Sequence, residues 1–307
     1  MALLLSSVDN VNISGAWLTI GSFDGVHRGH QELINGLVYE AHQAGAPAVV
    51  LTFFPHPAVV LRGITMPFYL TPPSERNELI NRLGADAVIT LTFNQQLASL
   101  SAAEFMSELS ARLALNQLWV GINFALGHNR EGNVPVLQRL GEELGYTVKV
   151  IPPVNINGSL ISSSLVRKAL SAGCVEDAAL ALGRFYSVTG EVVHGNSRGH
   201  QLGFPTANLS VWKEQLIPAY GIYACWAWVD GQRRPAATSI GVRPTFEMHP
   251  VSPSIETYLL DFNRNLYGQQ LRLEFVARLR DELRFNSIDA LVEQIHIDVE
   301  NVKRLLV

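Results

Sequence analysis

The chain has 307 residues, of which 48% are hydrophobic and 16% charged, so it is long enough for two domains with ordinary buried cores. Its formal net charge of -4 at pH 7 argues against a general nucleic-acid-binding surface, although a local basic site remains compatible with it. The apolar first ten residues lack a basic region, and no apolar run approaches the ~20 residues that span a membrane, so we expect neither a signal peptide nor a membrane partner.

The first half of the chain alternates between strand-like and helix-like segments. Apolar runs typical of buried strands lie at 17–20, 48–54, 86–93, 117–124 and 147–154. Apolar residues at helical spacing lie at 29–45, 74–84, 101–115 and 135–145. Ser101 and Glu104 add a capping-box pattern at the start of the third helix. This alternation predicts a parallel α/β sheet with helices on both faces and a ligand site at the carboxyl ends of its strands.

After about Gly183 the pattern changes to strands separated by Gly, Pro and Asn turns. Strand-like segments lie at 186–195, 221–229, 234–242, 254–262 and 269–279. A last helix begins after Ser287, which is a suitable N-cap. We therefore predict two domains, residues 1–183 and 184–307, of which the second is a small closed antiparallel β-barrel with a C-terminal helix.

The sequence GSFDGVHRGH, residues 21–30, lies where the first of these strands meets the first helix. Its glycines permit a sharp turn and a close approach of the backbone to a ligand. The free N–H groups and positive dipole end of the following helix favour an anion. His27 and His30 are about one helical turn apart, so both can face the same ligand and donate hydrogen bonds to phosphate oxygens.

Two other interpretations of this histidine pair stay open on the residues alone. The pair could ligate a metal, or the two histidines could be unrelated surface residues. No cysteine or acidic cluster nearby completes a zinc-binding set. The chain also contains neither the P-loop pattern nor G-x-G-x-x-G, so other common phosphate-binding motifs do not explain this corner.

The segment GVHRGH resembles the H-x-G-H signature of the nucleotidyltransferase superfamily, and ISSSLVRKAL, residues 161–170, resembles its second motif. In the second motif Ser164 replaces the usual threonine, and read alone its serines are also an ordinary helix cap. The resemblance implies a Rossmann-like fold and an ATP site at which His27 and His30 stabilise phosphate charge. The further residues implied for this adenylyl-transfer site are Gly21, Phe23, Asp24, Gly29, Ser162, Ser163 and Arg167.

Two later loops, residues 52–57 and 120–132, resemble the substrate loops of bacterial flavin adenylyltransferases. That resemblance implies an FMN site that includes His56 and Asn123. The chain departs from the pattern because Phe54 stands at a position that is often polar and Asn123 stands where many relatives have Asp. The pair Ala125–Leu126 also replaces a usual aromatic or basic pair.

The sequence RGHQLGFPTANL, residues 198–209, is the most specific stretch of the second half. The Thr206 hydroxyl and the Asn208 amide oxygen are hard ligands that suit Mg²⁺, whereas the alternative is a plain loop before a strand. The stretch resembles the G-x-P-T-A-N signature of riboflavin kinases. The kinase ATP and flavin site that this implies comprises Gly203, Pro205, Thr206, Asn208 and Arg243, with Glu256 as general base. Tyr258 replaces a usual His, and Trp226 and Trp228 are interpreted as packing residues.

Together the two halves are similar to the bifunctional prokaryotic riboflavin kinase/FAD synthetase family over nearly the whole chain. This implies phosphorylation of riboflavin to FMN by the second domain and adenylyl transfer from ATP to FMN by the first, both with Mg²⁺. Two alternatives stay open: a kinase whose first half has lost catalysis, and a flavin-binding module without turnover. Cys174 and Cys225 form no framework, which favours the cytoplasm; the oligomeric state is not indicated.

Overall fold

The computed structural model describes residues 3–7, 13–64, 67–156, 158–195, 203–242 and 253–307. Contacts between Cα atoms divide the chain into two compact units, Met1–Ser163 and Ser164–Val307. Each unit has its own buried core. None of the helices in the described ranges is both long and apolar enough to cross a membrane.

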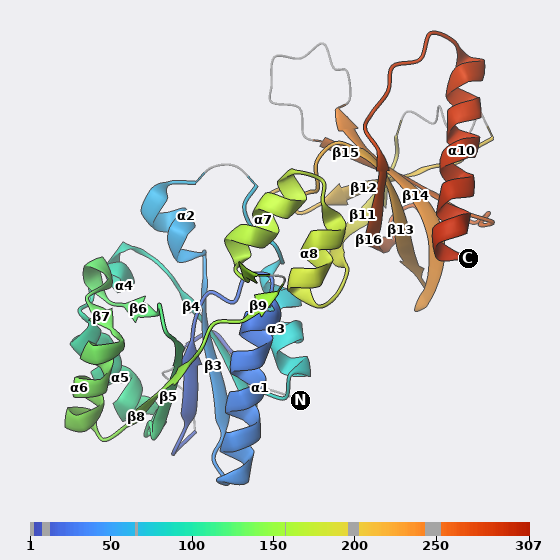
Figure 1. Ribbon diagram of the computed structural model, residues 1–307. Helices are drawn as coiled ribbons and strands as arrows, with labels where there is room; N and C mark the ends of the chain where they lie inside the picture. The colour runs from blue at the N-terminus through green and yellow to red at the C-terminus, as the bar shows by residue number, and fades with distance from the viewer. Residues whose placement is uncertain (1–2, 8–12, 65–66, 157, 196–202, 243–252) are drawn as a thin grey trace. The chain divides into compact units, whose positions relative to one another are not determined.

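The first unit is built on a six-stranded parallel sheet with the order β1-β4-β3-β2-β5-β8 (Figure 1). Its strands are β1 (Leu3–Leu5), β2 (Trp17–Ile20), β3 (Ala48–Phe54), β4 (Ala87–Thr92), β5 (Gln117–Gly121) and β8 (Thr147–Ile151). Short antiparallel pairs add β6 (Ala125–Leu126) with β7 (Gly132–Asn133), and β9 (Asn155–Ile156) with β10 (Ser159–Leu160). The predicted parallel sheet is thereby confirmed.

Helices cover both faces of this sheet, as the alternation predicted. The helices of the unit are α1 (Arg28–Gln43), α2 (Pro57–Arg62), α3 (Pro73–Arg82), α4 (Gln95–Ser99), α5 (Ala102–Leu113) and α6 (Val134–Leu144). On one face Val49 and Leu51 of β3 share a core with Met106 of α5. On the other face Val50 shares a core with Ile34 of α1. Because side chains alternate along a strand, one strand serves both cores.

Some element ends differ from those expected. The strand expected to reach residue 124 ends at Gly121, because the chain turns there and the N–H of Phe124 bonds back to the carbonyl of Gly121. The strand expected to reach residue 154 ends at Ile151, because Pro152 and Pro153 have no N–H to donate to a ladder. The expected capping box of α5 is present, since Ser101 and Glu104 cap each other reciprocally.

The second unit is a closed barrel with the strand order β11-β12-β15-β14-β13-β16, so the predicted barrel is confirmed (Figure 1). Its strands are β11 (Tyr186–Val193), β12 (Ala207–Val211), β13 (Gly221–Val229), β14 (Gln232–Val242), β15 (Pro253–Leu259) and β16 (Gln270–Arg280). All neighbouring pairs are antiparallel. The fully buried Thr238 and Thr257 hydroxyls bond each other at 2.8 Å inside the barrel, whereas Trp226 and Trp228 face outward.

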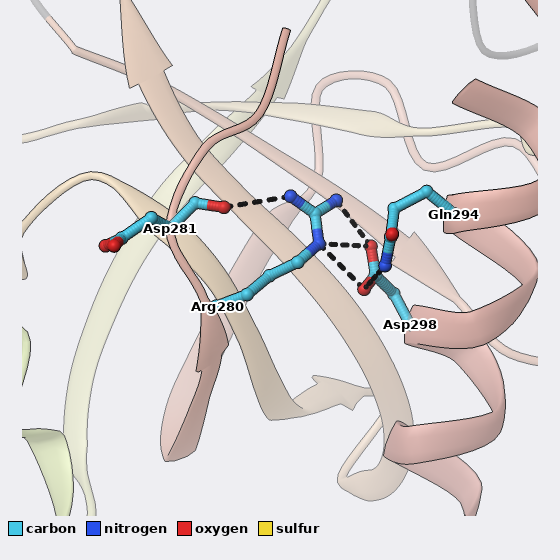
Figure 2. A network of polar contacts seen from close by, with 4 residues as sticks. All are labelled: Arg280, Asp281, Gln294 and Asp298. Carbon is cyan, nitrogen blue, oxygen red and sulfur yellow. Dashed lines mark hydrogen bonds and ion pairs between the residues drawn. The ribbon is translucent and has the colours of Figure 1, made fainter. Parts of the chain in front are cut away.

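Three helices accompany the barrel: α7 (Ser163–Ser171), α8 (Val175–Leu182) and α10 (Ile288–Leu306). Val299 and Val302 of α10 pack with Ala224 of β13, and the Ser287 hydroxyl caps the helix as expected. An ion pair fixes α10 to the end of β16, where the partly buried Arg280 guanidinium meets the buried Asp298 carboxylate at 2.7 to 3.2 Å (Figure 2). Gln294 donates a further hydrogen bond to the same carboxylate.

Candidate functional site

A cavity of about 840 Å³ opens at the carboxyl ends of the parallel strands. Its wall includes Gly21 after β2, Phe53 of β3, Gly121 of β5 and Ile151 of β8. β2 and β5 are neighbours although distant in sequence, and from them the strand order runs in opposite directions. Open α/β sheets bind ligands at such a switch point, and the volume lies within the usual range for ligand pockets.

The loop between β2 and α1 forms one side of this cavity. Phe23 and Val26 have φ of 47° and 39°, values that residues other than glycine rarely adopt. A Cβ on Gly21 would lie 2.9 Å from the ring of the buried Phe23, so only glycine lets that ring pack on the strand end. Gly29 likewise lies directly against the His27 ring. The glycines are therefore needed for close packing of this corner.

His27 and His30 lie together at the start of α1. His27 is the N-cap residue, and its Nδ1 accepts a hydrogen bond from the backbone N–H of His30 at 3.3 Å. The two rings stack with centroids 3.6 Å apart and an interplanar angle of 17°. Because Nδ1 of His27 is the acceptor, the ring proton of its neutral form lies on Nε2. Both residues line the cavity, and the interpretation that the pair faces one ligand stays a prediction.

His30 carries the more unusual electrostatics of the two. Its Nδ1 is buried and has no hydrogen-bond partner among the described residues, and its ring meets the edge of Phe23. Burial, and secondly the neighbouring His27, lower the pKa of His30 well below 6.5. The imidazole is thus neutral at pH 7, and a ligand that enters the cavity can supply its missing partner.

The side chains that line the cavity are either basic or uncharged. No aspartate or glutamate occurs among the described residues of its wall. The ionisable lining residues are His27, His30, His56, Arg62, His128 and Arg130. A cavity with this lining suits an anionic ligand better than a cation. Among the residues that the structure describes, there is no group of three or more His, Cys, Asp or Glu that could hold a metal.

Asp24 braces the site and does not line the cavity. Its buried carboxylate accepts hydrogen bonds from the N–H groups of Leu70 and Thr71 at 3.0 to 3.2 Å. The sequence analysis missed its neighbour Arg76, which is 2% exposed and whose Nη1 donates to the carbonyls of Ser22 and Phe53. Burial lowers the pKa of Arg76 to about 10, and Asp24 opposes that shift. No local sequence signal marks a buried arginine in an otherwise polar helix.

The second motif divides between the two compact units. Ser162 lines the cavity, and the Ser163 hydroxyl donates to the carbonyl of Asp24 at 2.8 Å, which ties the motif to the β2–α1 loop. The helix expected to follow these hydroxyls is α7, which begins at Ser163. Arg167 lies on α7 within the second unit.

The residues expected at the flavin site also line the cavity. His56 caps α2, since its Nδ1 accepts from the N–H of Ala58 at 3.0 Å, and its own N–H donates to the Tyr69 hydroxyl. The carbonyl of Asn123 accepts a hydrogen bond from Arg130 at 3.3 Å. Ala125 and Leu126, which depart from the family pattern, form part of the same wall. The cavity thus brings together the two loops that the sequence analysis assigned to one ligand.

The candidate site of the second unit is a row of polar residues across three barrel strands. Glu256 of β15 lies opposite Asn208 of β12 on one side and Ser239 of β14 on the other. Ile255 and Thr257 are buried in the barrel, so Glu256 and its row face outward. The Ser254 hydroxyl donates to Oε1 of Glu256 at 3.2 Å. The carboxylate is therefore accessible and held from its own strand.

Gly203, Pro205 and Thr206 lead directly into β12 beside this row. Gly203 has φ of +84°, which favours glycine, and a Cβ on Gly195 would overlap the Asn208 amide. Asn208 is 5% exposed, so its side chain is held closely. The oxygen donors of Thr206, Asn208 and Glu256 are of the type that Mg²⁺ prefers. Arg243, also expected here, lies outside the described residues.

Comparison with known proteins finds a matching family for each of the two units. A family model described as FAD synthetase matches residues 9–165, and one described as riboflavin kinase matches residues 182–306. A "Bifunctional riboflavin kinase/FMN adenylyltransferase" of Pseudomonas fluorescens is 38% identical, over 95% of this chain and 93% of its own length. The Bacillus subtilis protein of the same name is 36% identical, over 94% of this chain and 91% of its own.

A solved structure from Streptococcus pneumoniae matches with a TM-score of 0.90 and 30% sequence identity, covering 98% of each chain. Its title describes a macrolide-efflux protein. That title concerns the Streptococcus protein, whereas the curated relatives of this chain carry the names of flavin enzymes. The structural match supports the fold of both units.

Proposed function

The chain belongs to the bifunctional riboflavin kinase/FMN adenylyltransferase family, and from that premise we propose how its residues divide the two reactions. The enzyme phosphorylates riboflavin to FMN with ATP, and it transfers the adenylyl group of a second ATP to FMN, which gives FAD and pyrophosphate. We assign the adenylyl transfer to residues 1–183 and the kinase to residues 184–307.

In adenylyl transfer, a phosphate oxygen of FMN forms a bond to the α-phosphorus of ATP while the bond to the pyrophosphate oxygen breaks. Negative charge develops on the leaving pyrophosphate. His27 and His30 stand at the positive end of α1 and donate hydrogen bonds to that charge, which is where preorganised donors accelerate a reaction most. Gly21, Gly29, Ser162, Ser163 and Arg167 complete the ATP site. His56 and Asn123 serve the FMN side.

In the kinase, Glu256 takes a proton from the 5′-hydroxyl of riboflavin as that oxygen attacks the γ-phosphorus of ATP and ADP leaves. Thr206 and Asn208 hold the nucleotide with its magnesium. Mg²⁺, when bound, neutralises charge on the phosphates. The outward-facing row of Asn208, Glu256 and Ser239 is the observation that supports this assignment, because it joins a base to metal-type ligands across adjacent strands.

The test is a chromatographic time course with purified protein, riboflavin, ATP and Mg²⁺, in which riboflavin, FMN and FAD are separated. FMN that appears first and is followed by FAD supports both assignments. FMN without FAD would support the kinase alone and point to the departures at Phe54, Asn123, Ala125 and Leu126. Flavin binding without any product would contradict the catalytic roles. We expect that omitting Mg²⁺ or adding a chelator stops both steps, and a step that continues would show that it does not need the metal.

We also propose that the enzyme works in the cytoplasm. Cys174 and Cys225 are free, and Cys225 is fully buried, with burial raising the pKa of its thiol to about 12. Free thiols suit a reducing compartment, where ATP is also supplied. Fractionation of cells with an antibody against the protein tests the assignment, and recovery in the membrane or secreted fraction would contradict it.

A further inference from the structure

A second carboxylate, that of Glu282, lies beside the row that carries Glu256. Glu282 is exposed and follows β16 in the connection to α10. A Cβ built on Gly241 of β14 would overlap the Glu282 carboxylate, so this carboxylate fills the space that a side chain at position 241 would take. Ile240 is fully buried in the barrel, so position 241 faces outward. Glu282 therefore lies on the same outer face as Glu256.

The strand register places Glu282 next to the kinase base. Gly241 pairs with Ser254, and the Ser254 hydroxyl bonds the Glu256 carboxylate at 3.2 Å. Ser239, two residues before Gly241 on the same strand, lies opposite Glu256 itself. The Glu282 carboxylate thus lies over Gly241, on the strand next to that of Glu256 and two residues along from the position opposite Glu256.

The ion pair described above holds the connection from which Glu282 projects. Arg280, two residues earlier, bonds the buried Asp298 with both Nε and Nη2, and its Nη1 donates to the carbonyl of Asp281 (Figure 2). This fixes the backbone on both sides of the turn onto α10. The position of Glu282 is therefore set by contacts within the barrel unit.

The direction of phosphoryl transfer indicates which of the two substrates lies near Glu282. Thr206 and Asn208 are the expected ligands of the nucleotide and its magnesium. Asn208 belongs to β12, on one side of Glu256, and Thr206 immediately precedes that strand, whereas Glu282 lies over β14 on the other side. Strands are ~4.8 Å apart, so about 10 Å separates the two edges of the row. Because the attacking and leaving oxygens stand roughly in line across the phosphorus, the acceptor alcohol approaches from the β14 side.

We propose that Glu282 is a specificity-determining residue for the acceptor of the kinase, which it binds by accepting a hydrogen bond from a ribityl hydroxyl other than the one that reacts. The inference rests on the proposed roles of Glu256, Thr206 and Asn208. A carboxylate accepts strongly from a hydroxyl, so it selects a polyhydroxylated chain over an acceptor that lacks one. Gly241 is needed for this contact, because any side chain at position 241 would displace the Glu282 carboxylate.

The test compares Glu282→Gln and Glu282→Ala with the full-length enzyme by steady-state kinetics of riboflavin phosphorylation. We expect the alanine variant to raise KM for riboflavin about 10-fold or more and the glutamine variant less, with kcat and KM for ATP nearly unchanged. The affinity for lumiflavin, which has the ring system without the ribityl chain, should not change. Glu300→Gln, an exposed acidic residue of α10, is the matched control. Adenylylation of supplied FMN and the melting temperature report on folding.

Three results would overturn the proposal: an unchanged KM for riboflavin, a raised KM for ATP, or a loss of lumiflavin affinity equal to that of riboflavin. Gly241→Ala should reproduce the effect of Glu282→Ala, and if it fails to fold the Glu282 variants still decide. Glu256→Gln separates this inference from the assignment on which it rests. That variant should keep its affinity for riboflavin while losing turnover, and retained turnover would contradict the base and leave the Glu282 result standing as a binding effect.

Discussion

The two candidate sites differ in their charge. The cavity of the first unit is lined by histidines and arginines without a carboxylate among its described wall residues, whereas the row on the barrel is centred on Glu256. Under the assignment proposed above, the difference follows from the two nucleophiles. The phosphate of FMN, with a second pKa of about 6, is already an anion at pH 7 and needs no base. The ribityl hydroxyl is neutral and must lose a proton, so the kinase requires a carboxylate and the adenylyltransferase requires donors.

Removal of the base should sharpen this contrast most. Glu256→Gln keeps the shape of the side chain but cannot accept the proton, and we expect the kinase kcat to fall by about 10²–10⁴-fold. Adenylylation of supplied FMN should continue at the unchanged rate, because no step there uses Glu256. Both rates are measured by chromatography on the same preparation. Kinase activity that survives intact would show that another group takes the proton.

Removal of a donor should affect the opposite reaction. His30→Ala deletes an imidazole from the cavity, and we expect adenylyl transfer to slow by about 10²–10³-fold while riboflavin phosphorylation is retained. Rates at saturating FMN and ATP check the effect on the chemical step. His42→Ala, at an exposed histidine near the other end of α1, is the matched control. An equal loss in both histidine variants would point to damage to the helix.

A third change concerns stability within the barrel unit. Asp298→Asn leaves the partly buried Arg280 guanidinium without its anion, and we expect the barrel unit to lose up to about 3 kcal/mol of stability. Hydrogen exchange followed by mass spectrometry should show faster exchange in α10 and β16 and unchanged exchange in β2 and α1. Uniformly faster exchange in both units would contradict the independence of the two cores.

The smallest effect is a pH dependence confined to the first unit. Because the pKa of His30 is lowered well below 6.5 in the folded state, the unfolded chain binds a proton that the folded chain does not. The contribution of His30 to the free energy of unfolding is therefore fully present above pH 6.5. It is lost as the pH falls below that value, by at most about 1.4 kcal/mol per pH unit. Exchange of α1 amides between pH 7 and 5.5, corrected for intrinsic rates, measures this slope. In His30→Gln the slope should diminish, and an unchanged slope would assign it to other groups.

Much of the fold could be predicted from local pattern. The run at 48–54 and the periodicity of Leu37 and Val38 predicted β3 and α1, because strand and helix periods are properties of neighbouring residues. Ser101 and Ser287 predicted helix starts for the same reason. The short elements β1, α2, α4 and α8 were not expected, since three to eight residues carry too little periodicity, and His56 is not a typical cap.

The motifs of the candidate site could be predicted from the sequence, but the residues that hold those motifs in place could not. The positions of His27 and His30 followed from their spacing at a strand–helix corner. The buried Arg76, which holds the carbonyls of Ser22 and Phe53, and the packing of Glu282 on Gly241 depend on residues that are distant in sequence. Such partners are fixed by tertiary packing, and a single sequence does not contain the distances that define them.

The order of the strands in the barrel also has a consequence for synthesis on the ribosome. β16 pairs with both β11 and β13, so the barrel cannot close before residue 280 has emerged, and α10, which covers Ala224, emerges later still. All strands of the parallel sheet precede residue 152 and can pair earlier. A growing chain therefore passes through a period in which the sheet is complete and the barrel is open with apolar surface exposed. Chaperones that act on nascent chains would meet mainly the second unit.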